Sequence, residues 1–264
     1  MMHDIITTGD GCRIHYRFDG PEGAPVLVLS NSLGTSMAMW DAQMEAFTRY
    51  YRVLRYDSRG HGASDAPAGA YSIDRLGCDL IDLLNQLGLD AVHFCGLSLG
   101  GMIGQWLGYR QPSRVRSLVL ANTSAYMGPA SNWDARIKLV LSQGMAPLAE
   151  ASISRWFTPA FAAANPDAVA PIHNGLLATT PAGYAGCCAA VRDMDMRRLG
   201  VLNPVPTLVI GGLRDPATPP AASEALAAEI PGAQCAWLEA AHLSNVEQPE
   251  PFAQLVLDFL QTRN

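Results

Sequence analysis

The chain has 264 residues, of which 49% are hydrophobic and 16% charged, and its formal net charge is −6. This length is sufficient to bury an ample core in one large domain, and the acidic balance excludes the basic surface typical of nucleic-acid binding. The sequence contains neither an apolar run of about 18 residues nor an N-terminal secretory pattern. We therefore expect a protein of the cytoplasm without nucleic-acid or membrane partners.

The cysteines are scattered through apolar surroundings. They are Cys12, Cys78, Cys95, Cys187, Cys188 and Cys235. They form no CxxC pair and no cluster with histidine at the spacing of zinc ligands. We interpret them as small buried hydrophobic residues, and we expect neither disulfides nor a metal or other cofactor.

The first part of the chain predicts strands that alternate with helices. Residues 11–19 alternate like a half-exposed strand, and the apolar run 26–29 is typical of a buried strand. A helix is expected at 39–50 and a strand at 52–56. An amphipathic helix is expected at 72–87, where leucines recur every three or four positions.

A Gly-x-Ser-x-Gly turn follows the next apolar run. Residues 91–95 are predicted as a strand, Gly96 and Gly100 flank Ser98, and a helical pattern follows at 102–109. A serine on such a tight turn takes a strained backbone conformation, and side chains at the two glycines would collide with the neighbouring strand and helix. The pattern also occurs by chance, but this strand and helix context favours a nucleophilic serine.

The alternation lapses after a predicted strand at 115–121. From residue 122 to about 202 the sequence is richer in alanine, methionine, proline and aromatic residues, with short helical patterns at 135–141 and 147–157. Further strands and helices are predicted at 207–210, 220–230, 234–238 and 249–260. We expect the middle segment to be a helical insertion.

The alternation predicts an α/β fold with a mainly parallel, doubly wound sheet and a helical cap. We assign residues 1–121 and 202–264 to the core and residues 122–201 to the cap. Ligands of such sheets bind at the carboxyl ends of the strands. Polar residues that directly follow predicted strands are therefore the first candidates for a functional site.

Ser98, Asp215 and His242 each follow the end of a predicted strand, so the fold can bring them together. A serine hydroxyl needs a base to take its proton and a third group to hold that base in the right tautomer. The order serine, acid, histidine along the chain is that of α/β-hydrolases. We expect Ser98 to be the nucleophile, His242 the base and Asp215 its partner.

Other interpretations of these residues remain open. Asp215 precedes a proline and could simply cap a turn, and His242 could lie on the surface. Asp193 and Asp195 are alternative acids within the insertion. His61 lies in a glycine-rich loop, where a histidine more often hydrogen-bonds the backbone to fix the shape of the loop.

An oxyanion requires hydrogen-bond donors aimed at the charge that develops. These are usually the backbone N–H after the nucleophile and one from the loop after the third strand. We assign them to Leu99 and Leu33. The side chains of these two residues are incidental to that role.

Several motifs together resemble the α/β-hydrolase fold family over nearly the whole chain. They are Gly96–Gly101, the loop Asp57–Ser64, Gly211–Asp215 and Ala241–His242. Segments that further resemble 3-oxoadipate enol-lactonases of bacterial protocatechuate catabolism are Ser30–Thr35, Met39–Asp41, Arg55–Ser64 and Arg155–Phe157. Most relatives carry His-Gly where this chain has Asn31-Ser32, a departure that follows the lactonase subgroup.

The resemblance implies hydrolysis of a five-membered enol-lactone bearing a carboxymethyl group, through an acyl-enzyme, to give 3-oxoadipate. The substrate is an anion and the protein is acidic, so a local cation is needed. Arg155 and Arg192 are candidates, although either could lie on a solvated helix face. Trp133 and Trp156 could wall a small apolar pocket, as the resemblance suggests, or belong to the core of the cap.

Other hydrolase activities are compatible with the same triad. A carboxylesterase, another lactonase, a carbon–carbon bond hydrolase and a cofactor-free perhydrolase would share it, whereas a haloalkane dehalogenase needs a carboxylate in place of Ser98. A non-catalytic binding module is disfavoured because all three triad residues are intact. The sequence carries no signal for an oligomeric state.

Overall fold

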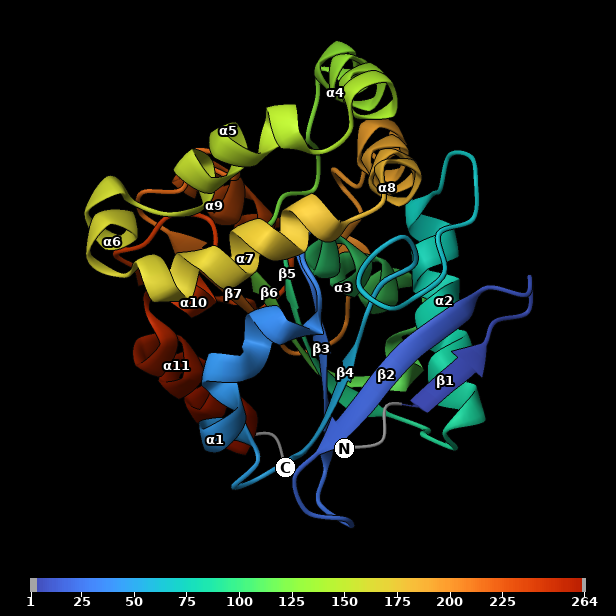
Figure 1. Cartoon of the computed structure of the whole chain (residues 1–264). Coiled ribbons are helices and arrows are strands. Elements are labelled where there is room, and N and C mark those ends of the chain that lie inside the picture. The colour runs from blue at the N-terminus through green and yellow to red at the C-terminus, as the bar shows by residue number, and fades with distance from the viewer. Residues whose placement is uncertain (1–3, 263–264) are drawn as a thin grey trace.

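The computed structural model describes residues 4–262 and centres on an eight-stranded sheet (Figure 1). The strands are β1 (Asp4–Thr7), β2 (Arg13–Asp19), β3 (Val26–Ser30), β4 (Arg52–Tyr56), β5 (Val92–Leu97), β6 (Val115–Ala121), β7 (Thr207–Gly212) and β8 (Gln234–Leu238). Their order across the sheet is β1-β2-β4-β3-β5-β6-β7-β8. β2 pairs antiparallel with β1 and β4, and the other pairs are parallel. The predicted α/β class with a mainly parallel sheet is confirmed.

Helices cover both faces of the sheet. α2 (Ile73–Gln86) and α3 (Leu99–Arg110) lie on one side, and α1 (Met44–Phe47) and α11 (Pro249–Gln261) on the other (Figure 1). Further helices outside the segment between β6 and β7, or at its end, are η2 (Pro112–Arg114), η3 (Gly200–Leu202), α9 (Pro220–Glu229) and α10 (Ser244–Glu247). Every residue of β5 and β7 is buried, which explains why their sequences are nearly continuous apolar runs.

The first helical segment lies where we predict a helix at 39–50, and it consists of two consecutive pieces. A 3-10 helix, η1 (Met37–Gln43), leads into the short helix α1. The indole of Trp40 is fully buried and donates a hydrogen bond to Asn31 Oδ1 at 2.9 Å. The predicted helical stretch is confirmed as far as Phe47, and its first part is a 3-10 helix. The edge strand β1 is not predicted from the sequence, because Ile6 is its one buried residue.

Five α-helices lie between β6 and β7. They are α4 (Ala130–Gln143), α5 (Ala146–Trp156), α6 (Pro159–Ala164), α7 (Pro166–Ala178) and α8 (Pro181–Asp193). They form a layer over the sheet, with α4 and α5 at the top of the view (Figure 1). α4 and α5 correspond to the predicted helical patterns, whereas α6, α7 and α8 were not predicted individually. A helical segment therefore occupies the expected place, and the domain limits that we assign remain a prediction.

The helix α8 packs directly against the core. The backbones of Gly60 and Gly183 approach so closely that a Cβ atom on Gly183 would lie 2.3 Å from the carbonyl oxygen of Gly60. Next to this contact, the N–H of Tyr71 donates to the carbonyl of Gly186 at 3.0 Å. The segment between β6 and β7 is thus fastened to the loop that follows β4.

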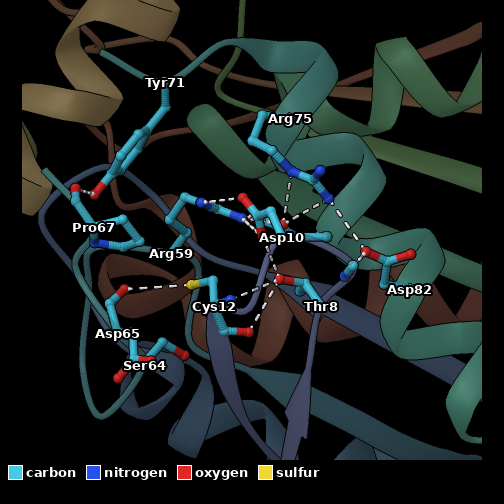
Figure 2. Close-up of polar contacts among 12 residues, drawn as sticks. Thr8, Asp10, Cys12, Arg59, Ser64, Asp65, Pro67, Tyr71, Arg75 and Asp82 are labelled. Carbon is cyan, nitrogen blue, oxygen red and sulfur yellow. Dashed lines mark hydrogen bonds and ion pairs between the residues drawn. The ribbon is translucent and has the colours of Figure 1, made fainter. Parts of the chain in front are cut away.

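A buried arginine fixes the same loop (Figure 2). The guanidinium of Arg59 donates to both carboxylate oxygens of Asp79, at 2.8 and 2.7 Å, and to Asp10 at 2.9 Å. Asp79 also accepts a hydrogen bond from Arg75 at 3.0 Å. The hydrogen bond from Arg59 holds the pKa of Asp10 far below its usual range. Residues 57–64 are thereby tied to α2 and to the N-terminal strand pair.

The six cysteines are free thiols. Most are buried as predicted, and burial raises the pKa of the Cys188 thiol to about 12. Cys235, on the edge strand β8, is exposed, so its interpretation as a buried residue is wrong. Within residues 4–262, histidine, cysteine and acidic side chains form no cluster that could hold a metal ion. No helix in that range combines the length and apolar character needed to cross a membrane.

Candidate active site

Ser98 occupies the turn between β5 and α3. Its backbone has φ 56° and ψ −112°, a strained conformation for a residue with a side chain. A Cβ atom on Gly96 would lie 2.2 Å from the carbonyl oxygen of Gly100, and one on Gly100 would lie 2.1 Å from that of Ser30. Glycine is therefore required on both sides of Ser98, as the Gly-x-Ser-x-Gly pattern predicts.

Asp215 and His242 lie together on the loops that follow β7 and β8. Asp215 Oδ2 is 2.8 Å from His242 Nδ1, and both side chains are buried. Asp215 also accepts hydrogen bonds from the N–H groups of Ala217 and Thr218, at 2.7 and 3.0 Å, and from the Thr218 hydroxyl at 2.6 Å. Burial opposes ionisation of Asp215. The charge and hydrogen bond of His242, with the bonds from Thr218, outweigh burial and hold the pKa of Asp215 below its usual value.

Asn122 supports this pair, and it is not among the residues that the sequence predicts for the site. It follows β6, is fully buried, and has a positive φ of 43°. Its amide donates to Asp215 Oδ2 at 3.0 Å and to the carbonyl of Ala241 at 3.2 Å, and its Oδ1 accepts from the Ser244 hydroxyl at 2.5 Å. Asn122 therefore connects the aspartate to the histidine loop. An asparagine directly after a strand was its only signal in the sequence.

A cavity of about 290 Å³ lies between the strand ends and the helices α4, α5 and α8. Predicted site residues that line it are Leu33, Ser98, Trp133, Arg155, Trp156 and His242. The structure thus brings the serine and the histidine to one cavity. The two tryptophans form part of its wall, on the side of the helical segment.

Two arginines line this cavity without a carboxylate partner in the described part of the chain. They are Arg155, which we predicted, and Arg136 of α4, which we did not. The guanidinium of Arg136 lies over the Trp133 ring, 4.8 Å from its centroid. Burial, together with the nearby charge of Arg136, lowers the pKa of Arg155. An anion in the cavity would compensate the partly buried charge of Arg155 and offset the repulsion between the two arginines.

Arg192, the other arginine predicted to bind a carboxylate, and the alternative acids lie elsewhere. Arg192 forms ion pairs with Asp134 at 2.9 Å and with Asp193 at 2.7 Å, and it does not line the cavity. Its position does not support the predicted role in carboxylate binding, because its charge is already neutralised. The alternative acids Asp193 and Asp195 pair with arginines, whereas Asp215 is the one that meets His242.

The loop after β3 is held tightly against the cavity. The N–H of Ser32 donates to the sulfur of Met39 at 3.3 Å, and the N–H of Gly34 donates to His61 Nε2 at 2.8 Å. Because Nε2 accepts, Nδ1 carries the ring proton and donates to the carbonyl of Arg59 at 3.3 Å. Leu33 is therefore fixed between two bonded N–H groups. His61 acts on the backbone, in agreement with its interpretation from the sequence.

Comparison with known proteins identifies the family to which this architecture belongs. The family model described as alpha/beta hydrolase fold matches residues 25–163, a range that includes Ser98 and most of α4 to α6. The match covers more than half of the chain. We conclude that the chain belongs to the α/β-hydrolase fold family.

The chain is similar to several individual proteins over nearly its whole length. The 3-oxoadipate enol-lactonase 2 of Acinetobacter baylyi is 42% identical over 96% of this chain and 94% of its own length. A hydrolase from Pseudomonas aeruginosa PA01 has a TM-score of 0.96 at 48% identity, covering 98% of both chains. The enol-lactonase from Burkholderia xenovorans LB400 has a TM-score of 0.96 at 40% identity, covering 98% of this chain and 100% of the other. A Stutzerimonas stutzeri protein provisionally named carbamate hydrolase RutD is 35% identical over 94% of this chain and 96% of its own length.

Proposed function

We propose that this protein is a serine hydrolase that opens 3-oxoadipate enol-lactone to 3-oxoadipate, as a step of bacterial protocatechuate catabolism. The observation that carries the proposal is the meeting of Ser98, His242 and the arginines Arg136 and Arg155 in one cavity. The serine and histidine supply ester-cleaving chemistry, and the arginines supply charge for the carboxylate of the substrate. The enol-lactonase relatives support this choice of substrate.

In the first half-reaction, Ser98 Oγ attacks the carbonyl carbon of the lactone while its proton passes to His242. Asp215 is bonded to Nδ1, so Nε2 takes the proton. The N–H groups of Leu33 and Leu99 hold the oxyanion. Collapse of this first tetrahedral intermediate breaks the ring C–O bond, and the enol oxygen leaves with the proton from His242. The opened enol, still esterified to Ser98, then tautomerises to the ketone.

In the second half-reaction, a water molecule attacks the acyl carbon and gives a proton to His242. Collapse of this second tetrahedral intermediate breaks the bond to Ser98 Oγ, which recovers the proton from His242. The product leaves with a second carboxyl group, which ionises in water. Asp215 stays ionised throughout and stabilises the imidazolium in both steps, in keeping with its lowered pKa.

The direct test follows the loss of enol-lactone absorbance with purified protein. Wild-type protein should open the lactone, and S98A should lower kcat by at least about 10⁴-fold, because the whole nucleophilic pathway is removed. A serine-reactive phosphonate should label wild-type protein but not S98A. Full activity in S98A would contradict the proposal.

One relative is named as a carbamate hydrolase, so hydrolysis of a carbamate is the most specific alternative activity for the same residues. The competing activities are tested with a panel of reactants: a small carbamate, neutral p-nitrophenyl esters, unsubstituted lactones, and peroxide with a carboxylic acid. The arginine-lined cavity leads us to expect the highest kcat/KM for the carboxylated enol-lactone. A higher kcat/KM for a carbamate or a neutral ester would contradict the proposed substrate. The assignment of Ser98 as the nucleophile would still stand.

A further inference from the structure

Glu247 is a buried carboxylate that lies outside the cavity. It ends the short helix α10, and its exposed fraction is 6%. Within residues 4–262 no arginine, lysine or histidine forms an ion pair with it. Burying a carboxylate without a cationic partner is costly unless hydrogen bonds compensate. Its hydrogen bonds therefore indicate what it does.

The donors to Glu247 come from two segments that are far apart in the sequence. Oε2 accepts from the N–H of Ala241 at 3.0 Å and from the N–H of Thr158 at 3.2 Å, and Oε1 accepts from the Thr158 hydroxyl. Ala241 directly precedes His242, and Thr158 follows the end of α5. One carboxylate thus joins the histidine loop to the end of a helix that lines the cavity.

A backbone contact reinforces the same junction. The N–H of Leu243 donates to the carbonyl of Trp156 at 3.0 Å. Both neighbours of His242 are therefore bonded, directly or through Glu247, to residues 156–158. His242, Arg155 and Trp156 all line the cavity. The base and this part of the binding wall are consequently held in one fixed arrangement.

We propose that Glu247 is a positioning residue that sets His242 relative to the cavity wall formed by Arg155 and Trp156. The inference rests on the proposed function, since it takes His242 as the base. Glu247 does not touch the reacting atoms: it lies outside the cavity lining and acts through Ala241 and Thr158. A displacement of about 1 Å at a reacting group can cost about a hundredfold in rate, so this fixation has a direct effect on turnover.

Four variants separate the two sides of the junction. E247A removes both sides, and E247Q keeps them, because an amide oxygen can accept both N–H groups and the NH₂ can donate to the Thr158 hydroxyl. T158V removes the hydroxyl contact with Glu247 and also the hydroxyl cap on Phe161 N–H, whereas T158S retains both. The matched control is E250A, which removes an exposed carboxylate at the start of α11.

Each variant is characterised by kcat and KM for the enol-lactone, by the rate at which a phosphonate labels Ser98, and by Tm. We expect E247A to lower kcat about tenfold or more, to raise KM and to slow labelling, because hydrogen bonds to a charged group are lost. E247Q should recover most of the loss. T158V should raise KM by a larger factor than it lowers kcat, since it loosens the wall, and T158S should reverse this.

The inference is overturned if E247A resembles E250A in kcat, KM and labelling rate and differs only in Tm. If E247A does not fold, T158V and T158S decide: equal KM values in these two variants contradict the inference. The labelling rate separates this inference from the proposed substrate. Slower labelling of E247A in a protein that does not open the lactone would support the positioning role and reject the substrate.

Discussion

Arg136 and Arg155 place two positive charges in a cavity of a protein whose net charge is −6. A guanidinium remains charged at any physiological pH, and it matches a carboxylate with two parallel hydrogen bonds. Neither arginine has a carboxylate partner among the described residues. The local charge that an anionic lactone requires is therefore present although the protein as a whole would repel it.

We expect R136A and R155A each to raise KM for the enol-lactone about tenfold or more, because a hydrogen bond to a charged group is lost. For a neutral p-nitrophenyl ester, KM should change much less. R192A is the matched control, since Arg192 is ion-paired outside the cavity and should leave KM for the lactone unchanged. Steady-state kinetics with both substrates measure this. An effect of R192A equal to that of R155A would contradict the assignment.

His61 holds the loop that carries Leu33, and its acceptor nitrogen gives it a pH dependence. Burial lowers the pKa of His61 below its ordinary value of 6.5. The unfolded chain therefore takes up a proton at a higher pH than the folded chain. This contribution to stability is complete above about pH 6.5 and is lost as the pH falls, at up to about 1.4 kcal/mol per pH unit until the folded protein is also protonated.

We predict that wild-type protein is less stable at pH 5.5 than at pH 7.5, and that this difference is smaller in H61Q, by up to about 1.4 kcal/mol. The amide oxygen of glutamine can still accept from the N–H of Gly34, so the loop retains its bond without a titratable group. Urea unfolding of both proteins at the two pH values gives the comparison. Identical differences would show that His61 does not contribute.

At the scale of elements, the contact between α8 and the loop after β4 depends on two glycines. Gly60 and Gly183 meet backbone to backbone, and neither has room for a Cβ atom. A methyl group at Gly183 must push α8 away from the core, and overpacking of this kind costs about 1–3 kcal/mol. Gly175 on α7 is the opposite case, because nothing lies within 4 Å of a Cβ atom placed there.

We therefore expect G183A to lower the free energy of unfolding by about 1–3 kcal/mol and G175A to raise it by about 0.5–1 kcal/mol. Both substitutions are glycine to alanine in a helix of the same segment, and they differ in the space that is available for the Cβ atom. Denaturant unfolding provides both values. A stabilised G183A protein would mean that α8 can shift at no cost.

The sequence predicts those parts of the site that depend on order along the chain. Ser98, Asp215 and His242 follow strand ends, and parallel strands bring their carboxyl ends to one edge. Arg136 and Glu247 could not be predicted in this way. Arg136 matters because it lines the cavity and has no carboxylate beside it among the described residues. Glu247 matters because its hydrogen-bond donors are 89 and 6 residues away in the sequence. Such relationships exist only after the chain has folded.

At the scale of the whole molecule, several contacts bind the helical segment to the sheet. The Gly60–Gly183 approach holds α8, the bond from Leu243 to Trp156 holds the end of α5, and Glu247 reinforces the latter. These contacts lie at two separate places. The segment between β6 and β7 therefore has little freedom to unfold before the sheet does.

We predict that the helical segment and the sheet unfold in one transition. Trp133 and Trp156 report on the helical segment, and the three remaining tryptophans, Trp40, Trp106 and Trp237, report on the sheet and its helices. In the wild-type protein, fluorescence and far-UV circular dichroism should give the same denaturation midpoint. In the W133F/W156F variant, the fluorescence midpoint should likewise coincide with the circular dichroism midpoint of that variant. A wild-type fluorescence transition at lower denaturant than the loss of helix signal would contradict this.

The two arginines of the cavity also affect how the protein behaves in solution. Because Arg136 and Arg155 repel each other in the free protein, any small anion that fits a cavity of about 290 Å³ is a potential competitor. An anion that binds the folded form also raises its stability, by RT ln(1 + [L]/Kd). Citrate and phosphate buffers should therefore raise Tm and the apparent KM together, and R136A and R155A should reduce both effects. The choice of buffer thus becomes a probe of the site before any substrate is available.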